Sequence, residues 1–216
     1  AHVAQLPAEI RRVGEVHRQY RRQLDSMEGK DIRIAMDEWN YWYGANEYGE
    51  LGVRYFLQDA LGIAAGLHEF FRNSDIYFMA NYAQTVNVIG AIKTTKTEAE
   101  FETTGLVLKL YRDRFGEVPV QLNGNFRPLD MAAALSRDGS VLTVAIVNPT
   151  DDRRTLDLKL AGGKLTGRGQ KWALSGEDKL SHNAPGKPRQ VDISTSTVTD
   201  AANKLEAAPL GVVVYR

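Results

Sequence analysis

Residues 32–43 read IRIAMDEWNYWY, a short apolar run that leads into two carboxylates and a cluster of aromatic rings. The run Ile32–Trp39 predicts a β-strand, because apolar residues dominate it and its length suits a strand. Alternate residues from Ile32 to Glu38 share one face, which the pattern assigns to the core, whereas Asp37 lies on the opposite face toward a helix layer as a structural carboxylate. A core face that ends on a charge is unusual, and it makes Glu38 a candidate functional residue.

Helices and strands alternate around this run. Apolar residues that recur every three or four positions predict helices, and a second short apolar run predicts another strand. The expected elements are a helix at Leu6–Leu24, a helix at Val53–Phe71, a strand at Asp75–Ala80 and a helix at Thr97–Phe115. Helix, strand, helix, strand, helix implies parallel β/α units.

After Pro119 the pattern changes to short apolar runs separated by turn residues. These runs predict antiparallel strands at Met131–Leu135, Val141–Val147, Thr155–Leu160, Gln170–Leu174, Gln190–Ser194 and Leu210–Tyr215. Asp138-Gly139 predicts a hairpin between the first two, and the Gly-rich Gly162–Gly169 stretch predicts a turn. The fold class is therefore α/β plus all-β, with a boundary near Glu117–Leu122 that separates residues 1–117 from residues 118–216.

The amino-acid composition excludes several kinds of functional site. The 216 residues carry 27 Lys+Arg against 27 Asp+Glu, so no global basic field exists to hold nucleic acid or a membrane surface. No cysteine is present, which excludes thiolate metal sites and cysteine nucleophiles. The four histidines lack metal-ligand spacing, and we expect neither a metal nor a cofactor. The longest uncharged stretch is too polar to span a bilayer, and the abrupt start of the chain suggests a fragment.

The end of the Ile32–Trp39 run combines acids with stacking aromatics. Between Asp31 and Asp75 the chain holds eight acids and three bases. Aromatic rings pack on the apolar faces of sugars while carboxylates bind hydroxyls or attack the anomeric carbon, so this composition suits a neutral polyhydroxylated ligand. A purely structural interpretation, in which Glu38 forms an ion pair and the aromatics are core, stays open on the pattern alone.

A family resemblance adds to this interpretation. The strings MDEWNYWYG at 36–44 and YFLQDALGIAAGLHEFFRNSDIYFMANYAQTVNVIGAI at 55–92 resemble the C-terminal half of family 51 glycoside hydrolases, the retaining alpha-L-arabinofuranosidases. The resemblance implies the last part of a (β/α)8 barrel followed by a C-terminal antiparallel β-sandwich of jelly-roll type. Only the last two barrel strands would lie in this chain.

The same resemblance implies roles for three residues. Glu38, in the DEWN motif, maps onto the nucleophile, Gln84 onto a residue that reaches the bound furanose, and Trp42 onto a residue that borders the sugar pocket. The acid/base glutamate of the family belongs to a barrel strand outside this chain. The Asn46-Glu47 pair matches its local motif, but it follows the same strand as Glu38, and we interpret it as a decoy. Asn87 either lines the pocket or bonds within its loop.

The function implied is release of alpha-L-arabinofuranosyl residues from arabinoxylan, arabinan or their oligosaccharides, as part of a larger enzyme. An endo-acting glucanase or xylanase, or a non-catalytic carbohydrate-binding or assembly fragment, are the alternatives. The expected partners are an arabinose-containing saccharide, a companion segment or chain that carries the rest of the barrel, and further copies of the protein in a homo-oligomer. The sequence leaves the location undecided, with the cytoplasm favoured.

Overall fold

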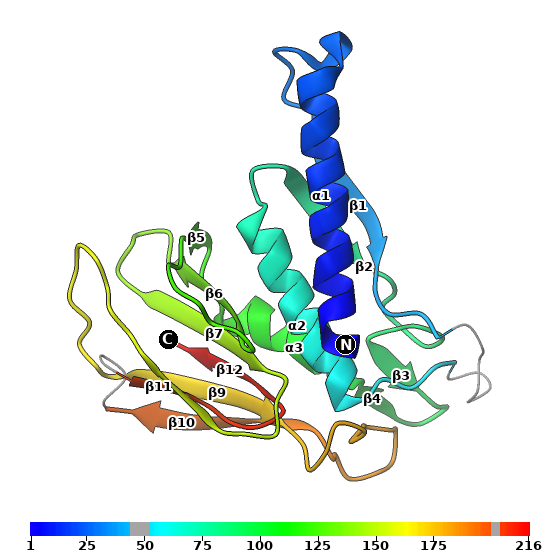
Figure 1. Ribbon diagram of the computed structural model, residues 1–216. Helices are drawn as coiled ribbons and strands as arrows, with labels where there is room; N and C mark the ends of the chain where they lie inside the picture. Colours follow the sequence, from blue (N-terminus) through cyan, green and yellow to red (C-terminus); the bar gives the residue numbers. More distant parts are fainter. Residues whose placement is uncertain (44–51, 200–203) are drawn as a thin grey trace.

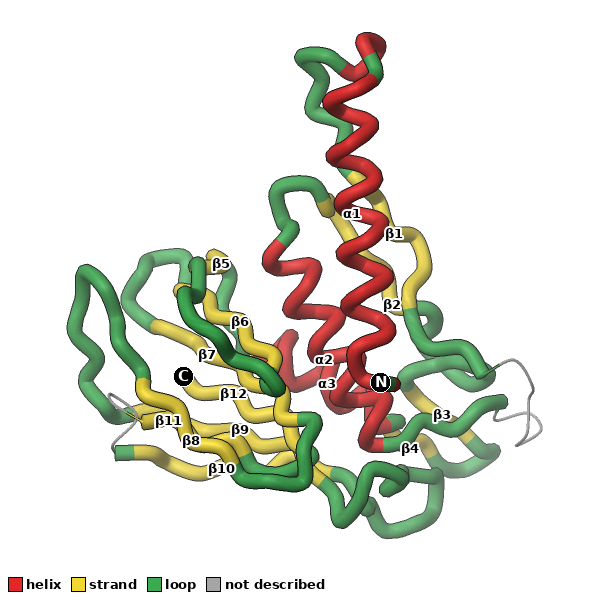
Figure 2. Tube along the Cα trace, in the orientation of Figure 1, coloured by secondary structure: helices red, strands yellow, loops and turns green. Residues whose placement is uncertain are grey.

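The computed structural model describes residues 1–43, 52–199 and 204–216 (Figure 1). Three main helices lie between a pair of parallel strands and a larger antiparallel sheet (Figure 2). The first part contains η1 (His2–Ala4), α1 (Gln5–Gln23), η2 (Asp25–Met27), β1 (Ile34–Trp39), α2 (Leu57–Arg72), β2 (Tyr77–Tyr82), β3 (Ile92–Thr94), β4 (Ala99–Phe101) and α3 (Thr103–Arg114). The second part contains β5 (Val118–Val120), β6 (Asp130–Leu135), β7 (Leu142–Asn148), β8 (Arg154–Asp157), β9 (Gly169–Ser175), β10 (Asp192–Val198), β11 (Lys204–Ala207) and β12 (Gly211–Tyr215).

Strands β1 and β2 pair in parallel and are joined through α2, as the alternating pattern predicts. One face of the pair packs on the helices. The other face is open, since Phe78 is 71% exposed and Met79 is 39% exposed. No third strand joins this pair within the described residues.

The face expected for β1 is confirmed only in part. Ile34 and Met36 pack against the buried apolar core, as expected, but Glu38 is exposed and does not continue their face. The register shifts between Met36, which pairs with Ala80, and Trp39, which pairs with Tyr82. Over this interval β1 contains one residue more than β2. This bulge places Trp39 in the core and leaves both Asp37 and Glu38 exposed, so Asp37 does not point into the helix layer.

The helix expected at Thr97–Phe115 begins later. Residues 92–101 form the antiparallel hairpin β3–β4, and α3 starts at Thr103. Backbone pairing explains the difference, because Thr95 N bonds the Glu98 carbonyl across the turn and Glu102 N bonds the Ala91 carbonyl. β-branched residues in this segment fit a strand better than a helix.

The second part is built on a six-stranded sheet with the order β10-β9-β12-β7-β6-β5, all pairs antiparallel. All six expected strand regions are present, with shifted ends, and the Asp138-Gly139 hairpin joins β6 to β7. One face of the sheet packs on α2 and α3, and the two-stranded sheet β8–β11 covers part of the other. The short strands β5 and β11 were not expected from the sequence.

Helix α2 lies at the centre of the fold. Twelve of its sixteen residues are buried, and its neighbours include α1, α3 and the six-stranded sheet. Small residues allow close approaches: a Cβ added to Gly66 would lie 3.2 Å from Leu6 of α1 and 3.3 Å from Trp39 of β1. A single apolar cluster therefore includes α2, α3 and strands from both parts.

Polar groups connect the same elements. His68 is fully buried on α2, with Nδ1 2.7 Å from Asp130 Oδ1 on β6 and Nε2 2.5 Å from Tyr111 Oη on α3. Burial lowers the pKa of His68, against the opposing effect of Asp130. Arg72 donates to both Asp130 and Glu69, so one network joins two helices to the sheet.

Glu69 extends this network to α1. Its carboxylate is 2% exposed and accepts two hydrogen bonds from Arg11, at 3.0 and 2.8 Å, in addition to those from Arg72. Burial alone would raise the pKa of Glu69, but the bonds from Arg11 and Arg72 outweigh it and lower the pKa below 4.5. The ionised carboxylate is therefore a stabilising connection between α1 and α2.

Glu69→Gln should lower the free energy of unfolding at pH 7 by about 1–3 kcal/mol, since charge-assisted bonds are lost from a buried site. Because the folded pKa is depressed, the stabilisation is present above pH 4.5 and is lost as pH falls through the folded pKa. Urea unfolding at pH 7 and at pH 3 measures this, and the gap between wild type and variant should shrink at pH 3.

Glu9→Gln is the matched control, because Glu9 forms an exposed ion pair with Arg12 on α1, the helix that also carries Arg11. Its effect should stay within about 0.5 kcal/mol. An equal loss in both variants would contradict the role assigned to the buried carboxylate.

Candidate active site

The candidate site lies where β1 and β2 end. The two strands are parallel, so their carboxyl ends share one edge, and Trp39 is opposite Tyr82 at that edge. Glu38 is exposed immediately before Trp39, and Gln84 is exposed two residues after β2. Trp42 follows β1 and is 75% exposed. The three residues expected to bind or attack a substrate therefore lie at or just after the ends of neighbouring strands, at one edge of the sheet.

Asn40 joins the segments that follow the two strands. Its Nδ2 donates to the carbonyl of Ala83 at 2.8 Å and to that of Ile89 at 2.9 Å. The same amide nitrogen lies 2.8 Å from Tyr55 Oη, and Tyr55 Oη donates to the Tyr41 carbonyl at 2.7 Å. Because Tyr55 is fully buried, this network fixes the exit of β1 against the loop after β2.

Gln84 belongs to a tightly bonded loop. Its Nε2 donates to the carbonyls of Val86 and Asn87, at 3.1 and 3.3 Å, and no described residue donates to its Oε1. Asn87 accepts from Thr94 N through Oδ1 at 2.8 Å, so it bonds within the loop. The Ala83–Gln84 peptide bond is cis. These bonds hold the amide while leaving its oxygen available to a hydroxyl donor.

A buried pair of opposite charges lies beneath this loop. Lys93 and Glu102 are each 2% exposed. Lys93 Nζ donates to the Val88 carbonyl at 2.9 Å, and Glu102 Oε2 accepts from Tyr55 N at 3.0 Å. Burial raises the pKa of Glu102 to about 7, against the opposing charge of Lys93, and burial likewise lowers the pKa of Lys93.

The aromatic residues that follow Glu38 divide between the core and the surface. Tyr41 is buried and stacks on His2 with ring centroids 4.6 Å apart. Tyr43 donates to Asp59, whose Oδ2 also accepts from Phe56 N at 2.7 Å at the start of α2. Trp42 remains exposed at the edge where Glu38 lies. Only part of the aromatic cluster is therefore available to a ligand.

Other expectations from the sequence concern the Asn46-Glu47 pair, metal binding and membrane spans. Asn46 and Glu47 lie outside the described residues. No group of three or more His, Asp or Glu residues that could hold a metal ion occurs in residues 1–43, 52–199 and 204–216. None of the helices in those ranges has the length and apolar character needed to cross a membrane.

Sequence reasoning missed Tyr55, Lys93 and Glu102. The available signal was a lysine directly after the apolar stretch GAI at 90–92, which predicts a charged group that must find partners in the core. Their partners come from segments far apart in the chain, so the pattern could not identify them.

Comparison with known proteins identifies the family of the chain. The model of the alpha-L-arabinofuranosidase C-terminal domain family matches residues 37–209. The chain belongs to this family. The resemblance to family 51 glycoside hydrolases is thereby confirmed. The matched residues include Glu38, Trp42 and Gln84.

Relatives and solved structures are similar over most of the chain. A probable alpha-L-arabinofuranosidase C of Aspergillus clavatus is 32% identical over 184 residues, covering 76% of this chain and 35% of the relative. An intracellular exo-alpha-(1->5)-L-arabinofuranosidase 1 of Bacillus subtilis is 24% identical, covering 87% of this chain and 42% of the relative. The family 51 alpha-L-arabinofuranosidase structure from Thermotoga petrophila is 26% identical, covering 99% of this chain and 48% of that chain, with a TM-score of 0.82. This chain therefore spans less than half the length of each of these proteins.

Glu102→Gln should change how stability depends on pH. Because burial raises the folded pKa of Glu102 from 4.5 to about 7, its ionisation opposes folding as pH rises through that window. The unfolding free energy of wild type minus that of the variant should fall by about 1–3 kcal/mol between pH 4.5 and pH 7.

Chemical unfolding at half-unit pH steps measures this difference. Glu177→Gln, at an exposed carboxylate in the loop after β9, is the control and should show a flat difference. A flat difference for Glu102→Gln would mean that its carboxyl group titrates alike in the folded and unfolded chain.

Proposed function

We propose that this chain is the C-terminal part of a retaining glycoside hydrolase that releases alpha-L-arabinofuranosyl residues from arabinoxylan, arabinan or their oligosaccharides. The observation that carries this proposal is the position of Glu38. It is an exposed carboxylate at the carboxyl end of a parallel strand, on the edge where Gln84 and Trp42 also lie. The names of the relatives support the substrate class.

In the proposed reaction Glu38 attacks the anomeric carbon and forms a glycosyl-enzyme ester, which water then hydrolyses with retention of configuration. Gln84 Oε1 accepts a hydrogen bond from a sugar hydroxyl. Trp42 packs its ring along the furanose. A strand end suits the nucleophile because a rigid element keeps the carboxylate in position.

The proton for the leaving oxygen comes from outside this chain. A general acid contributes typically 10²–10⁴-fold to such rates, so the complete enzyme needs a second carboxyl group about 5–5.5 Å from Glu38. A companion segment, in the same polypeptide or a second one, would pair with β1 and β2, cover Phe78 and Met79, and supply that acid. Open edges and exposed apolar side chains on this strand pair support the proposal.

The proposal also covers the architecture of the two parts of the chain. Strands β1 and β2 are the last two strands of a (β/α)8 barrel within residues 1–117, and residues 118–216 form a β-sandwich of jelly-roll type. We further propose a homo-oligomer that acts in the cytoplasm, the latter supported by the name of the Bacillus subtilis relative. No observation favours the endo-acting or the non-catalytic alternative over arabinofuranosidase activity.

Glu38→Gln in the full-length protein should lower kcat on an aryl arabinofuranoside by at least about 10³-fold, because the amide cannot act as the nucleophile. Glu28→Gln, at an exposed carboxylate far from the strand ends, is the matched control and should leave kcat unchanged. An activated fluoro-sugar should label Glu38. Near wild-type turnover of the variant, or labelling of Glu47 in its place, would contradict the assignment.

Gln84→Ala should lower kcat/KM by a factor that corresponds to about 1–3 kcal/mol, since a sugar hydroxyl loses its acceptor in a closed site. Steady-state kinetics on the full-length protein measures the loss. Thr85→Ala, at the next exposed residue of the loop, is the control. If both variants retain wild-type kcat/KM, Gln84 does not bind the sugar and its amide only forms hydrogen bonds within the loop.

A further inference from the structure

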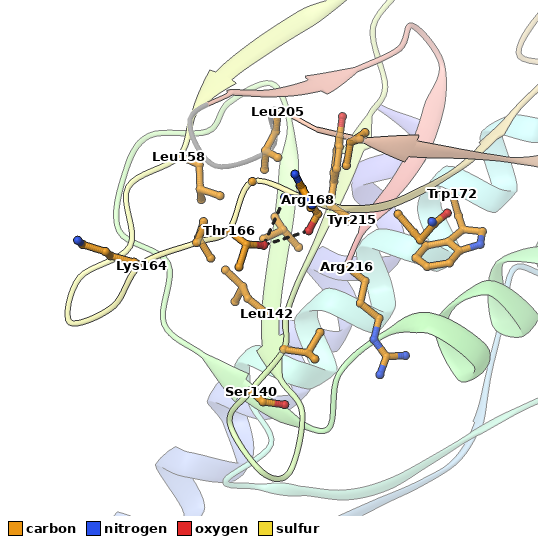
Figure 3. Close-up of a pocket in the computed structure, with 17 residues that line it drawn as sticks. Ser140, Leu142, Leu158, Lys164, Thr166, Arg168, Trp172, Leu205, Tyr215 and Arg216 are labelled. Atoms are coloured by element: carbon orange, nitrogen blue, oxygen red, sulfur yellow. Dashed lines mark hydrogen bonds between the residues drawn. The ribbon is translucent and has the colours of Figure 1, made fainter.

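A cavity lies in the second part of the fold, remote from β1 and β2. It encloses about 460 Å³ between the six-stranded sheet and the segment that runs from β8 through Gly162–Gly169 into β9 (Figure 3). Small-molecule sites typically measure about 300–1,000 Å³, so the cavity is of ligand size. Nothing in the proposed reaction uses it.

The walls of the cavity are mainly apolar. Leu142 and Val144 of β7 line it from the sheet, and Leu158 and Leu205 line it from the two-stranded sheet side, as Figure 3 shows for the three leucines. Tyr215 of β12 contributes a ring whose hydroxyl donates to the Glu206 carbonyl at 2.8 Å. The apolar part of a ligand would therefore be enclosed between two sheets.

The polar groups at the rim carry one sign of charge. Lys164, Arg168 and Arg216 line the cavity, and no Asp or Glu is among the described residues that line it. None of these three cations makes an ion pair within the described part of the chain. The chain as a whole is neutral, so this concentration of positive charge is local.

Backbone pairing places Arg216 beside the start of β9, the strand that directly follows Arg168. Arg216 and Gln170 exchange backbone hydrogen bonds of 2.7 and 2.9 Å, and a Cβ on Gly169 would lie 2.3 Å from the Arg216 carbonyl oxygen. Arg168 N bonds Thr166 Oγ1 at 3.3 Å at the end of the loop. The neighbouring carboxylate at the β6–β7 turn, Asp138, is engaged by Ser136 and Ser140. Lys164 and Arg168 therefore lie on the loop before β9 and Arg216 directly follows β12, and none of the three forms an ion pair with Asp138 among the described residues.

We propose that this cavity binds a small anionic amphiphile, a monocarboxylate with an apolar body. The apolar body would lie against the leucines between the sheets, and the carboxylate would lie at the rim beside Lys164 and Arg168. A neutral sugar fits less well, because the rim offers cationic donors without carboxylate acceptors.

Isothermal titration of the full-length protein with octanoate tests the proposal, with octanol and acetate as separate ligands. We expect saturable one-to-one binding of octanoate that is at least about tenfold tighter than that of octanol or acetate. From hexanoate to octanoate each added methylene should tighten binding by about fourfold, the value for burial of a CH₂ group. No saturable binding, or affinity independent of chain length, would overturn the proposal.

Charge reversal separates the cavity from general attraction to a basic surface. Lys164→Glu with Arg168→Glu should weaken octanoate binding by about tenfold. Lys96→Glu with Lys187→Glu makes the same change in net charge at exposed positions outside the lining and should leave binding unchanged. Equal weakening in both would overturn the assignment to this cavity. Thermal unfolding of each variant checks that the fold persists, and Leu158→Ser should reduce the chain-length dependence without altering net charge.

Discussion

The burial of α2 on nearly every side is the constraint on which the rest of this structure depends. A helix with so few exposed residues must be covered by several elements at once, and here α1, α3, the β1–β2 pair and the six-stranded sheet provide the cover. Small residues such as Gly66 set how closely α1 and β1 approach α2. The position of the candidate site follows, because α2 supports the strand pair from the side opposite to Glu38.

Polar bonds make that packing specific. The network through Glu69, His68 and Asp130 connects α1, α2, α3 and β6 in places where apolar contacts alone would allow the elements to slide. A second network, through Asn40 and Tyr55, joins the loops that carry the candidate site residues. These two sets of buried polar groups lie near opposite ends of α2, since Glu69 and His68 are close to its last residue and Tyr55 precedes its first.

The open face of β1 and β2 is consistent with a site completed by other residues. Glu38, the proposed nucleophile, supplies only one of the two groups that glycoside hydrolysis needs, since the leaving group also requires a proton donor. The short bulge in β1 matters here. It turns Trp39 into the core while Glu38 remains exposed, so one irregularity gives both a buried anchor and an exposed carboxylate.

The sequence by itself determined the order and type of most elements and singled out Glu38, Gln84 and Trp42, because hydrophobic period and local motifs are properties of neighbouring residues. It wrongly placed Glu38 on the core face with Ile34 and Met36, since a register shift depends on the partner strand and leaves no mark in strict alternation. It likewise missed the β3–β4 hairpin. Tertiary structure alone decided that Lys93 and Glu102 share one buried site, and that Arg168 and Arg216 meet at one cavity. These pairs arise from contacts between distant segments, whose energies depend on burial that only the folded chain creates.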